Sequence, residues 1–98
     1  MVSETKINCN VEFFGLSPEM TDLYDAEVEI NDGAGLPELI AALRRKVPTL
    51  EGQVIMPDKD MLQKGFAFNI NGEFHFEDEE VHVGKWDRVV LILLSAGG

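Results

Sequence analysis

The stretch that decides the fold is Val89-Val90-Leu91-Ile92-Leu93-Leu94, which runs directly into Ser95-Ala96-Gly97-Gly98. Consecutive apolar residues predict a strand over residues 88–94 that is buried on both faces, as in the centre of a sheet. The glycines lack a Cβ, so a tail over residues 95–98 can extend into a narrow groove and leave its terminal carboxylate unshielded. We therefore expect a tail that reacts through Gly98. The alternative is a frayed, flexible end.

Composition bounds the class of protein. Ninety-eight residues, 45% of them apolar, suffice for one domain over residues 1–98. The net charge of -10 argues against binding to nucleic acid or to an anionic membrane. It suits a partner with a basic face, although solubility alone also explains it.

Targeting signals are not evident in the sequence. No apolar stretch is long enough to span a membrane, and the first residues lack the pattern of a secretory signal. The single cysteine, Cys9, precludes an internal disulfide and suits a reducing compartment. We expect a cytoplasmic protein.

Periodicity predicts two strands and then a helix. Residues 7–13 and residues 26–30 alternate between apolar and polar side chains, as half-buried strands do. Residues 36–47 carry one apolar stripe at helical spacing. Pro37 suits the first helical turn, and Pro48 predicts where the helix stops.

The second half of the chain contains further strands. Residues 66–70 and 73–76 flank Asn71-Gly72, a strong hairpin signal. Residues 49–65 are ambiguous, with a possible short helical turn over 58–63. The order strand-strand-helix-strand-strand-strand predicts an α+β fold of the β-grasp (ubiquitin-like) type. Its mixed sheet would have four to five strands, one main helix on one face, and its last strand parallel to the first.

From residue 6 to Gly98 the chain resembles the ubiquitin-like sulfur carriers of the MoaD and ThiS type, with the MoaD-like branch favoured. The resemblance rests on four segments in the family's order: Val11-Glu12-Phe13-Phe14, Gly35-Leu36-Pro37-Glu38-Leu39, Phe68-Asn69-Ile70-Asn71-Gly72, and Val89 through Gly98. The turn Gly84-Lys85-Trp86-Asp87-Arg88-Val89 and the run Leu93-Leu94-Ser95-Ala96 depart from the MoaD pattern. These departures leave the pathway open.

The resemblance implies a mechanism at the tail. An ATP-using, ubiquitin-activating-type enzyme (MoeB-like or ThiF-like) would adenylate the Gly98 carboxylate, and a sulfur donor would convert it to a thiocarboxylate. The sulfur would pass to an acceptor enzyme such as a MoaE-like large subunit, which makes the small subunit of molybdopterin synthase the first expectation. The chain itself would be no enzyme and would bind no cofactor tightly. Gly97 would belong to the reactive end, and Ser95 and Ala96 would lie in the partner's channel.

A docking face is expected on the side of the sheet away from the helix. If Phe13, Val89, Leu91 and Leu93 face the helix, alternation leaves four apolar residues for a partner: Phe14, Val90, Ile92 and Leu94. Two alternatives stay open. Residues 49–65 could cover this face, and a shift of one residue would reverse the two faces.

The remaining candidate sites are weaker. Cys9 is in phase with apolar neighbours and is expected in the core. His75 and His82 are too few for a metal site, and the acidic run 77–80 lacks the ligand pattern of a calcium loop. Trp86 is expected to anchor the edge of the core. No catalytic set or phosphate-binding loop is evident.

Two rival functions remain open. A ubiquitin-like modifier would use the same tail to form isopeptide bonds through Gly98. A plain interaction module would not need the diglycine. An electron-transfer protein is disfavoured, because one cysteine cannot hold an iron–sulfur cluster that needs four. The final sulfur acceptor and the oligomeric state are not indicated by the sequence.

Overall fold

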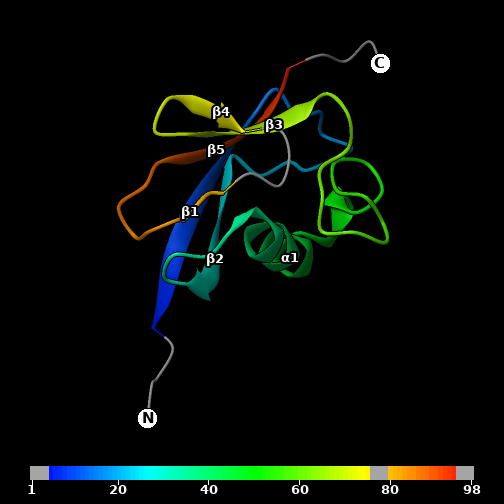
Figure 1. The fold of residues 1–98 in the computed structure, drawn as a ribbon. Coiled ribbons are helices and arrows are strands. Elements are labelled where there is room, and N and C mark those ends of the chain that lie inside the picture. The colour runs from blue at the N-terminus through cyan, green and yellow to red at the C-terminus, as the bar shows by residue number, and fades with distance from the viewer. Residues whose placement is uncertain (1–4, 76–79, 95–98) are drawn as a thin grey trace.

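The computed structural model describes residues 5–75 and 80–94 of the chain. Within these ranges the chain forms, in order, β1 (Lys6–Phe14), β2 (Asp25–Asn31), α1 (Leu36–Lys46), η1 (Pro48–Leu50), β3 (Phe66–Ile70), β4 (Glu73–His75) and β5 (Val89–Leu93) (Figure 1). The predicted order of elements is confirmed. The final strand is one residue shorter at each end than residues 88–94.

One mixed sheet contains all five strands, in the order β2-β1-β5-β3-β4. β5 lies parallel to β1, with Val11 opposite Val89, and antiparallel to β3, with Phe68 opposite Leu91. The last strand is therefore central, as its apolar character on both faces predicted. The parallel pair requires a crossover connection, and that connection contains α1.

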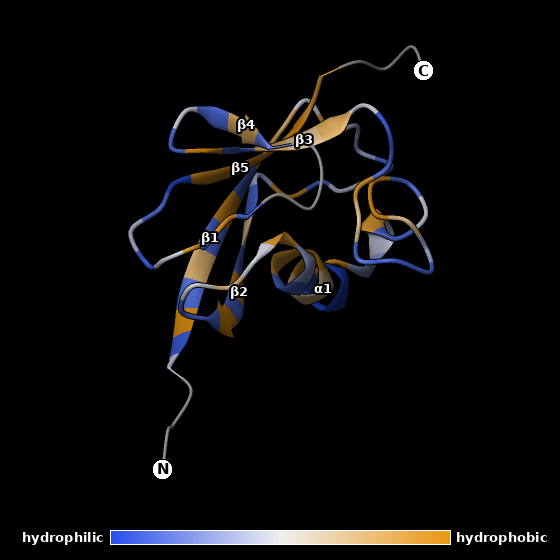
Figure 2. Ribbon diagram, in the orientation of Figure 1, coloured by the Kyte–Doolittle hydropathy of each residue, from blue (hydrophilic) through white to orange (hydrophobic). Residues whose placement is uncertain are grey.

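The core lies between the sheet and α1, which covers one sheet face (Figures 1 and 2). Val11, Val89 and Leu91 point into it and are fully buried. From α1 the buried side chains are Leu36, Leu39, Ile40, Ala42 and Leu43. The α+β, β-grasp fold that the sequence predicted is thus confirmed.

The ends of α1 follow the expected signals. Pro37 is in the first turn, and the Glu38 carboxylate accepts a hydrogen bond from the Asn31 N–H at 2.7 Å. The helix ends at Lys46 before Pro48, and Val47 is its buried C-cap. No helix in the described part of the chain has the length and hydropathy to cross a membrane.

The β3–β4 hairpin has the predicted turn. Asn71 and Gly72 have φ values of 53° and 93°, which match the positive φ that a type I′ turn requires at both central positions. Ile70 and Glu73 pair directly across it. Phe76, the last residue predicted for the returning strand, lies outside the described residues.

The segment between η1 and β3 differs from the prediction. Residues 58–63 form turns and bends rather than a helical turn, and the short helix is η1. Arg44 organises the segment, because its Nη2 donates to the carbonyls of Met56 at 2.8 Å and Lys59 at 2.6 Å. Arg44 also forms an ion pair with Asp60. Four apolar side chains enter the core: Leu50, Val54, Ile55 and Leu62.

Candidate functional site

Four apolar side chains lie along β5 and the end of β1, on the sheet face opposite α1. Phe14 sits beside Ile92 in the parallel register, and Val90 is two residues earlier on the same face. Phe14 is 65% exposed, and Leu94, which continues the alternation, is 44% exposed. We call Phe14, Val90, Ile92 and Leu94 the outer patch. These are the four residues predicted for this face.

The face assignment depends on which residues are buried. Val89 and Leu91 are fully buried, and Phe13 and Leu93 pack against the core. Residues 49–65 lie beside α1 (Figure 1), and their apolar side chains enter the core. The loop therefore does not cover the outer patch, and the faces are not reversed.

The outer patch includes a shallow depression. A hollow of about 600 Å³ is lined by three patch residues, Phe14, Val90 and Ile92, and by polar or small residues at its sides: Asn69, Asn71, Gly72 and Arg88. Leu94 lies one residue beyond β5, where its N–H donates to the Gly65 carbonyl at 2.8 Å. The chain is therefore still anchored to the body of the protein at the residue before the tail.

An ion pair borders the patch. The Arg88 Nε donates to Glu12 Oε2 at 2.9 Å, and Nη2 lies 3.3 Å from Oε1. This hydrogen bond, reinforced by the guanidinium charge, lowers the pKa of Glu12, and the same contact raises the pKa of Arg88. Sequence analysis missed the pair. No local signal in the sequence indicated it, because the two residues approach each other only when Glu12 lies opposite Val90 in the parallel register, two residues from Arg88.

Gly15 lies at the base of the tail. It follows β1 with a φ of +78°, and a Cβ at this position would lie 3.5 Å from the Leu93 carbonyl oxygen. The glycine thus lets the chain leave β1 close beside the end of β5. Sequence analysis did not predict that this glycine lies close to the last residue of β5.

The predicted reactive end lies outside the described residues. This applies to Ser95, Ala96, Gly97 and Gly98, and to residues 77–79 of the acidic run. The predictions for the tail therefore stay predictions. What the structure establishes is the position of the strand that leads to it.

Other candidate residues have ordinary positions. Cys9 is 2% exposed, and burial raises the pKa of its thiol, as expected for a core cysteine. His82 is exposed, with Nδ1 3.2 Å from the Gly33 carbonyl oxygen. Among the described residues no group of three or more His, Cys, Asp or Glu is placed to hold a metal ion.

The prediction for Trp86 was wrong. Its side chain is 89% exposed instead of anchoring the core, and the Lys85 Nζ lies 5.2 Å from the centre of its ring. The turn before β5 is instead held by polar contacts of Asp87, whose carboxylate accepts from the Gly84 N–H at 2.7 Å and the Asn71 amide at 2.8 Å.

Comparison with known proteins gives structural relatives only. No protein-family profile and no curated protein matches the sequence. The solved structure of SAMP1 from Haloferax volcanii aligns with a TM-score of 0.70 and 22% identity, covering 96% of this chain and 100% of SAMP1. A crystal structure of H. volcanii small archaeal modifier protein 1 aligns with a TM-score of 0.70 and 21% identity, covering 91% of this chain and 99% of that one.

A third solved structure is similar to the same extent. The solution structure of the Haloferax volcanii HVO 2177 protein aligns with a TM-score of 0.70 and 18% identity, covering 95% of this chain and 88% of that one. At these sequence identities the structural similarity establishes the fold but does not establish an activity. The chain thus has a ubiquitin-like β-grasp fold over nearly its whole length, with an exposed apolar patch beside the end of its central strand.

Proposed function

We propose that this protein is a sulfur carrier that reacts through its Gly98 carboxylate. One structural observation supports the proposal most strongly. The central strand β5 ends beside the exposed outer patch, and the chain is still anchored at Leu94 by its hydrogen bond to Gly65. Only three residues, Ser95, Ala96 and Gly97, separate Leu94 from Gly98. An enzyme that docks on the patch would therefore find the reactive end within short reach.

The chemistry follows from the weakness of a carboxylate as an electrophile. The Gly98 carboxylate attacks the α-phosphorus of ATP on a ubiquitin-activating-type (MoeB-like or ThiF-like) partner and releases pyrophosphate. A sulfur donor then displaces AMP from the acyl adenylate and leaves a thiocarboxylate. The partner supplies the acid–base and electrostatic catalysis, while this chain supplies recognition and the reacting carbonyl.

The outer patch would bind both the activating enzyme and the sulfur acceptor. The patch is apolar at its centre and is bordered by the Glu12–Arg88 pair, as protein interfaces commonly have an apolar centre and a polar rim. As the finer proposal, the acceptor is a MoaE-like large subunit and the chain is the small subunit of molybdopterin synthase. The resemblance of the sequence to the MoaD branch supports this choice.

Intact mass tests the proposal. The chain, produced with Gly98 as its last residue, is incubated with an activating enzyme, ATP and sulfide. We expect a mass gain equal to the exchange of one oxygen for sulfur, localised to Gly98. A matched variant with one alanine added after Gly98 should fold equally well and show no gain. An unchanged mass with an enzyme active on another carrier, or a gain in the extended variant, would reject the proposal.

A second candidate is a protein modifier, and one observation favours it. Two of the structural relatives are named SAMP1 and small archaeal modifier protein 1. A modifier would form an isopeptide bond between Gly98 and lysines of other proteins, after the same activation. Conjugates that survive a denaturing gel and disappear when Gly97 and Gly98 are deleted would support this role. If deletion leaves every interaction unchanged, the chain is instead a plain binding module.

A further inference from the structure

β2 is an edge strand with outward-facing backbone groups. It pairs only with β1 among the described residues. The Phe13 N–H donates to the Tyr24 carbonyl at 2.8 Å, which sets the phase of the antiparallel ladder. Ala26, Val28 and Ile30 therefore direct their N–H and C=O groups towards β1. The alternate residues direct theirs away from the sheet: Asp25, Glu27 and Glu29.

One end of this edge is already occupied. The Asn31 N–H, in the same outward phase, donates to the Glu38 carboxylate at 2.7 Å. No described residue forms a corresponding hydrogen bond with the outward backbone groups of Glu27 and Glu29. The middle of the edge is therefore available to an added strand.

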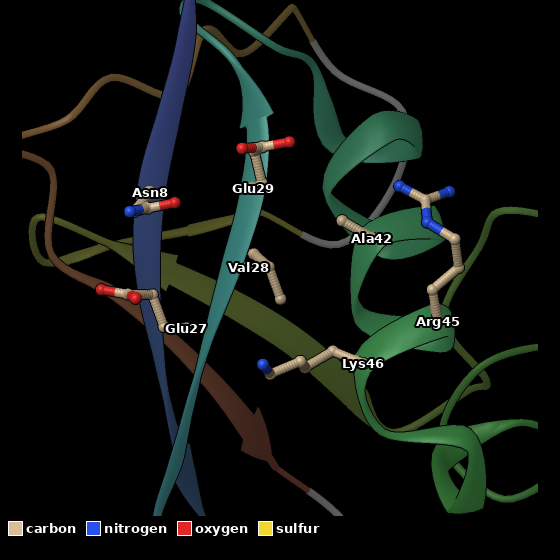
Figure 3. A pocket seen from close by; sticks show the side chains of 7 residues that line it. All are labelled: Asn8, Glu27, Val28, Glu29, Ala42, Arg45 and Lys46. Carbon is tan, nitrogen blue, oxygen red and sulfur yellow. The ribbon is translucent and has the colours of Figure 1, made fainter.

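A groove accompanies this part of β2. It encloses about 390 Å³ between β2 and the C-terminal half of α1 (Figure 3). Val28 and Ala42 line it with apolar side chains that are 3% and 4% exposed. The Lys46 side chain extends from α1 towards β2, and the Glu27 side chain lies on the other side of the strand.

The charges on the two sides of the groove have opposite signs. Arg45 and Lys46 line the helix side, and Glu27 and Glu29 line the strand side. Within the described chain neither of these two cations forms an ion pair, whereas Arg44 pairs with Asp60 and Arg88 with Glu12. In a chain of net charge -10, acidic side chains greatly outnumber basic ones, so two cations without an ion pair among the described residues suit an acidic group of a partner.

We propose that the β2 edge binds an extended segment of a partner protein as a sixth strand. The side chains of this partner segment alternate between the two faces of the sheet. On the outer face the segment has Lys or Arg opposite Glu27 and Glu29. On the inner face it has apolar residues above Val28 and Ala42, and an acidic residue beside Lys46. Main-chain hydrogen bonds supply affinity, and the charge pattern supplies register.

A second copy of this chain does not fit the same edge. Two β2 strands paired antiparallel about Val28 would place Glu27 and Glu29 of the two copies opposite each other. Like charges directly opposite on a sheet are destabilising. The acidic side chains thus disfavour self-pairing while favouring a basic strand.

The site is independent of the proposed reaction at Gly98. β2 is separated from β5 by β1, so a strand bound at the edge leaves the outer patch uncovered. The test of this inference measures binding alone. Its failure would therefore leave the sulfur-carrier proposal unaffected.

The experiment is an NMR titration of the full chain with two synthetic ten-residue peptides. Both alternate Lys with Val, and one Val is replaced by Asp near the N-terminus in the first peptide and near the C-terminus in the second. The pair thus allows for both strand directions. We expect one of them to shift and protect the Glu27 and Glu29 amides. The same peptide with N-methyl groups on every residue should not bind, because neither of its edges can then pair as a strand.

Matched variants separate the backbone from the charges. Glu27→Pro removes an outward N–H that does not take part in the β1 ladder, and it should weaken binding about tenfold beyond Glu27→Ala. The double variant Arg45→Glu/Lys46→Glu should bind the peptide less tightly than Lys59→Glu/Lys64→Glu, which makes the same change in net charge on exposed residues outside the groove. Comparing these two variants separates the effect of the groove from that of net charge.

Four results would overturn the inference. The first is that neither peptide binds. The second is binding with shifts centred outside β2 and α1. The third is equal affinity for Glu27→Pro and Glu27→Ala. Concentration-dependent dimerisation through β2 would equally reject it, since the proposal excludes a second copy as the occupant.

Discussion

The two faces of β5 have the same kind of side chain and opposite surroundings. On the inner face Val89 and Leu91 are fully buried under α1. On the outer face Val90 and Ile92 line an open hollow. Core formation accounts for the inner pair, because burial there contributes directly to folding. It does not account for the outer pair, so a contiguous apolar patch on this face calls for an explanation outside the domain itself.

The largest effect should come from the inner face. Leu91→Ala deletes part of a fully buried side chain in the central strand, and we expect it to lower the free energy of unfolding by about 2–5 kcal/mol. Urea denaturation measures this. Ile92→Ala is the matched control on the adjacent residue, and its cost should be clearly smaller. Equal costs would mean that the two faces do not differ in their contribution to folding.

An intermediate effect should come from a charge on the outer face. Ile92→Glu should leave the unfolding midpoint close to that of the wild type but slow activation of Gly98 about tenfold or more, as expected for loss of about 1.4 kcal/mol at an interface. The measurement is the rate of adenylate formation by the activating enzyme. Met61→Glu adds the same charge at an exposed apolar residue outside the patch and should have little effect. Similar slowing in both variants would point to net charge as the cause.

The smallest effect concerns the rim of the patch and depends on pH. The pKa of Glu12 is lowered in the folded protein from its ordinary value of 4.5, so the Arg88 contact stabilises the fold above that pH. The contribution is lost as the pH falls through the lowered pKa. Glu12→Gln should therefore be slightly less stable than the wild type at neutral pH and equally stable in strong acid. A stability difference that stays constant across this range would contradict the assignment.

Local signals were sufficient for most of the fold. Asn71-Gly72 predicted its type I′ turn because only a few residue types tolerate positive φ at both positions. The apolar run at 89–94 predicted a central strand, because an edge or one-sided strand would alternate. The same alternation predicted which residues of β5 face outwards.

Long-range contacts explain what sequence analysis missed. Residues 49–65 have no clear period, since they are held by the Arg44 side chain and by four apolar residues that enter the core separately. The Glu12–Arg88 pair joins residues at opposite ends of the chain and becomes apparent only once β1 and β5 are paired. Trp86 was misassigned because its size suggested burial, while the turn around it is held by Asp87.

The parallel pairing of β1 with β5 also affects how the protein is made. Among the strands of this sheet β1 is translated first, yet its partner in the centre of the sheet, β5, is translated last. Such a distant pairing folds slowly, because a long loop must close before the contact forms. A nascent chain that lacks β5 has only Phe14 of the outer patch and none of the residues that follow β5. On the sulfur-carrier proposal, such a truncated product would lack most of its docking surface together with its reactive end, and it would not occupy the activating enzyme.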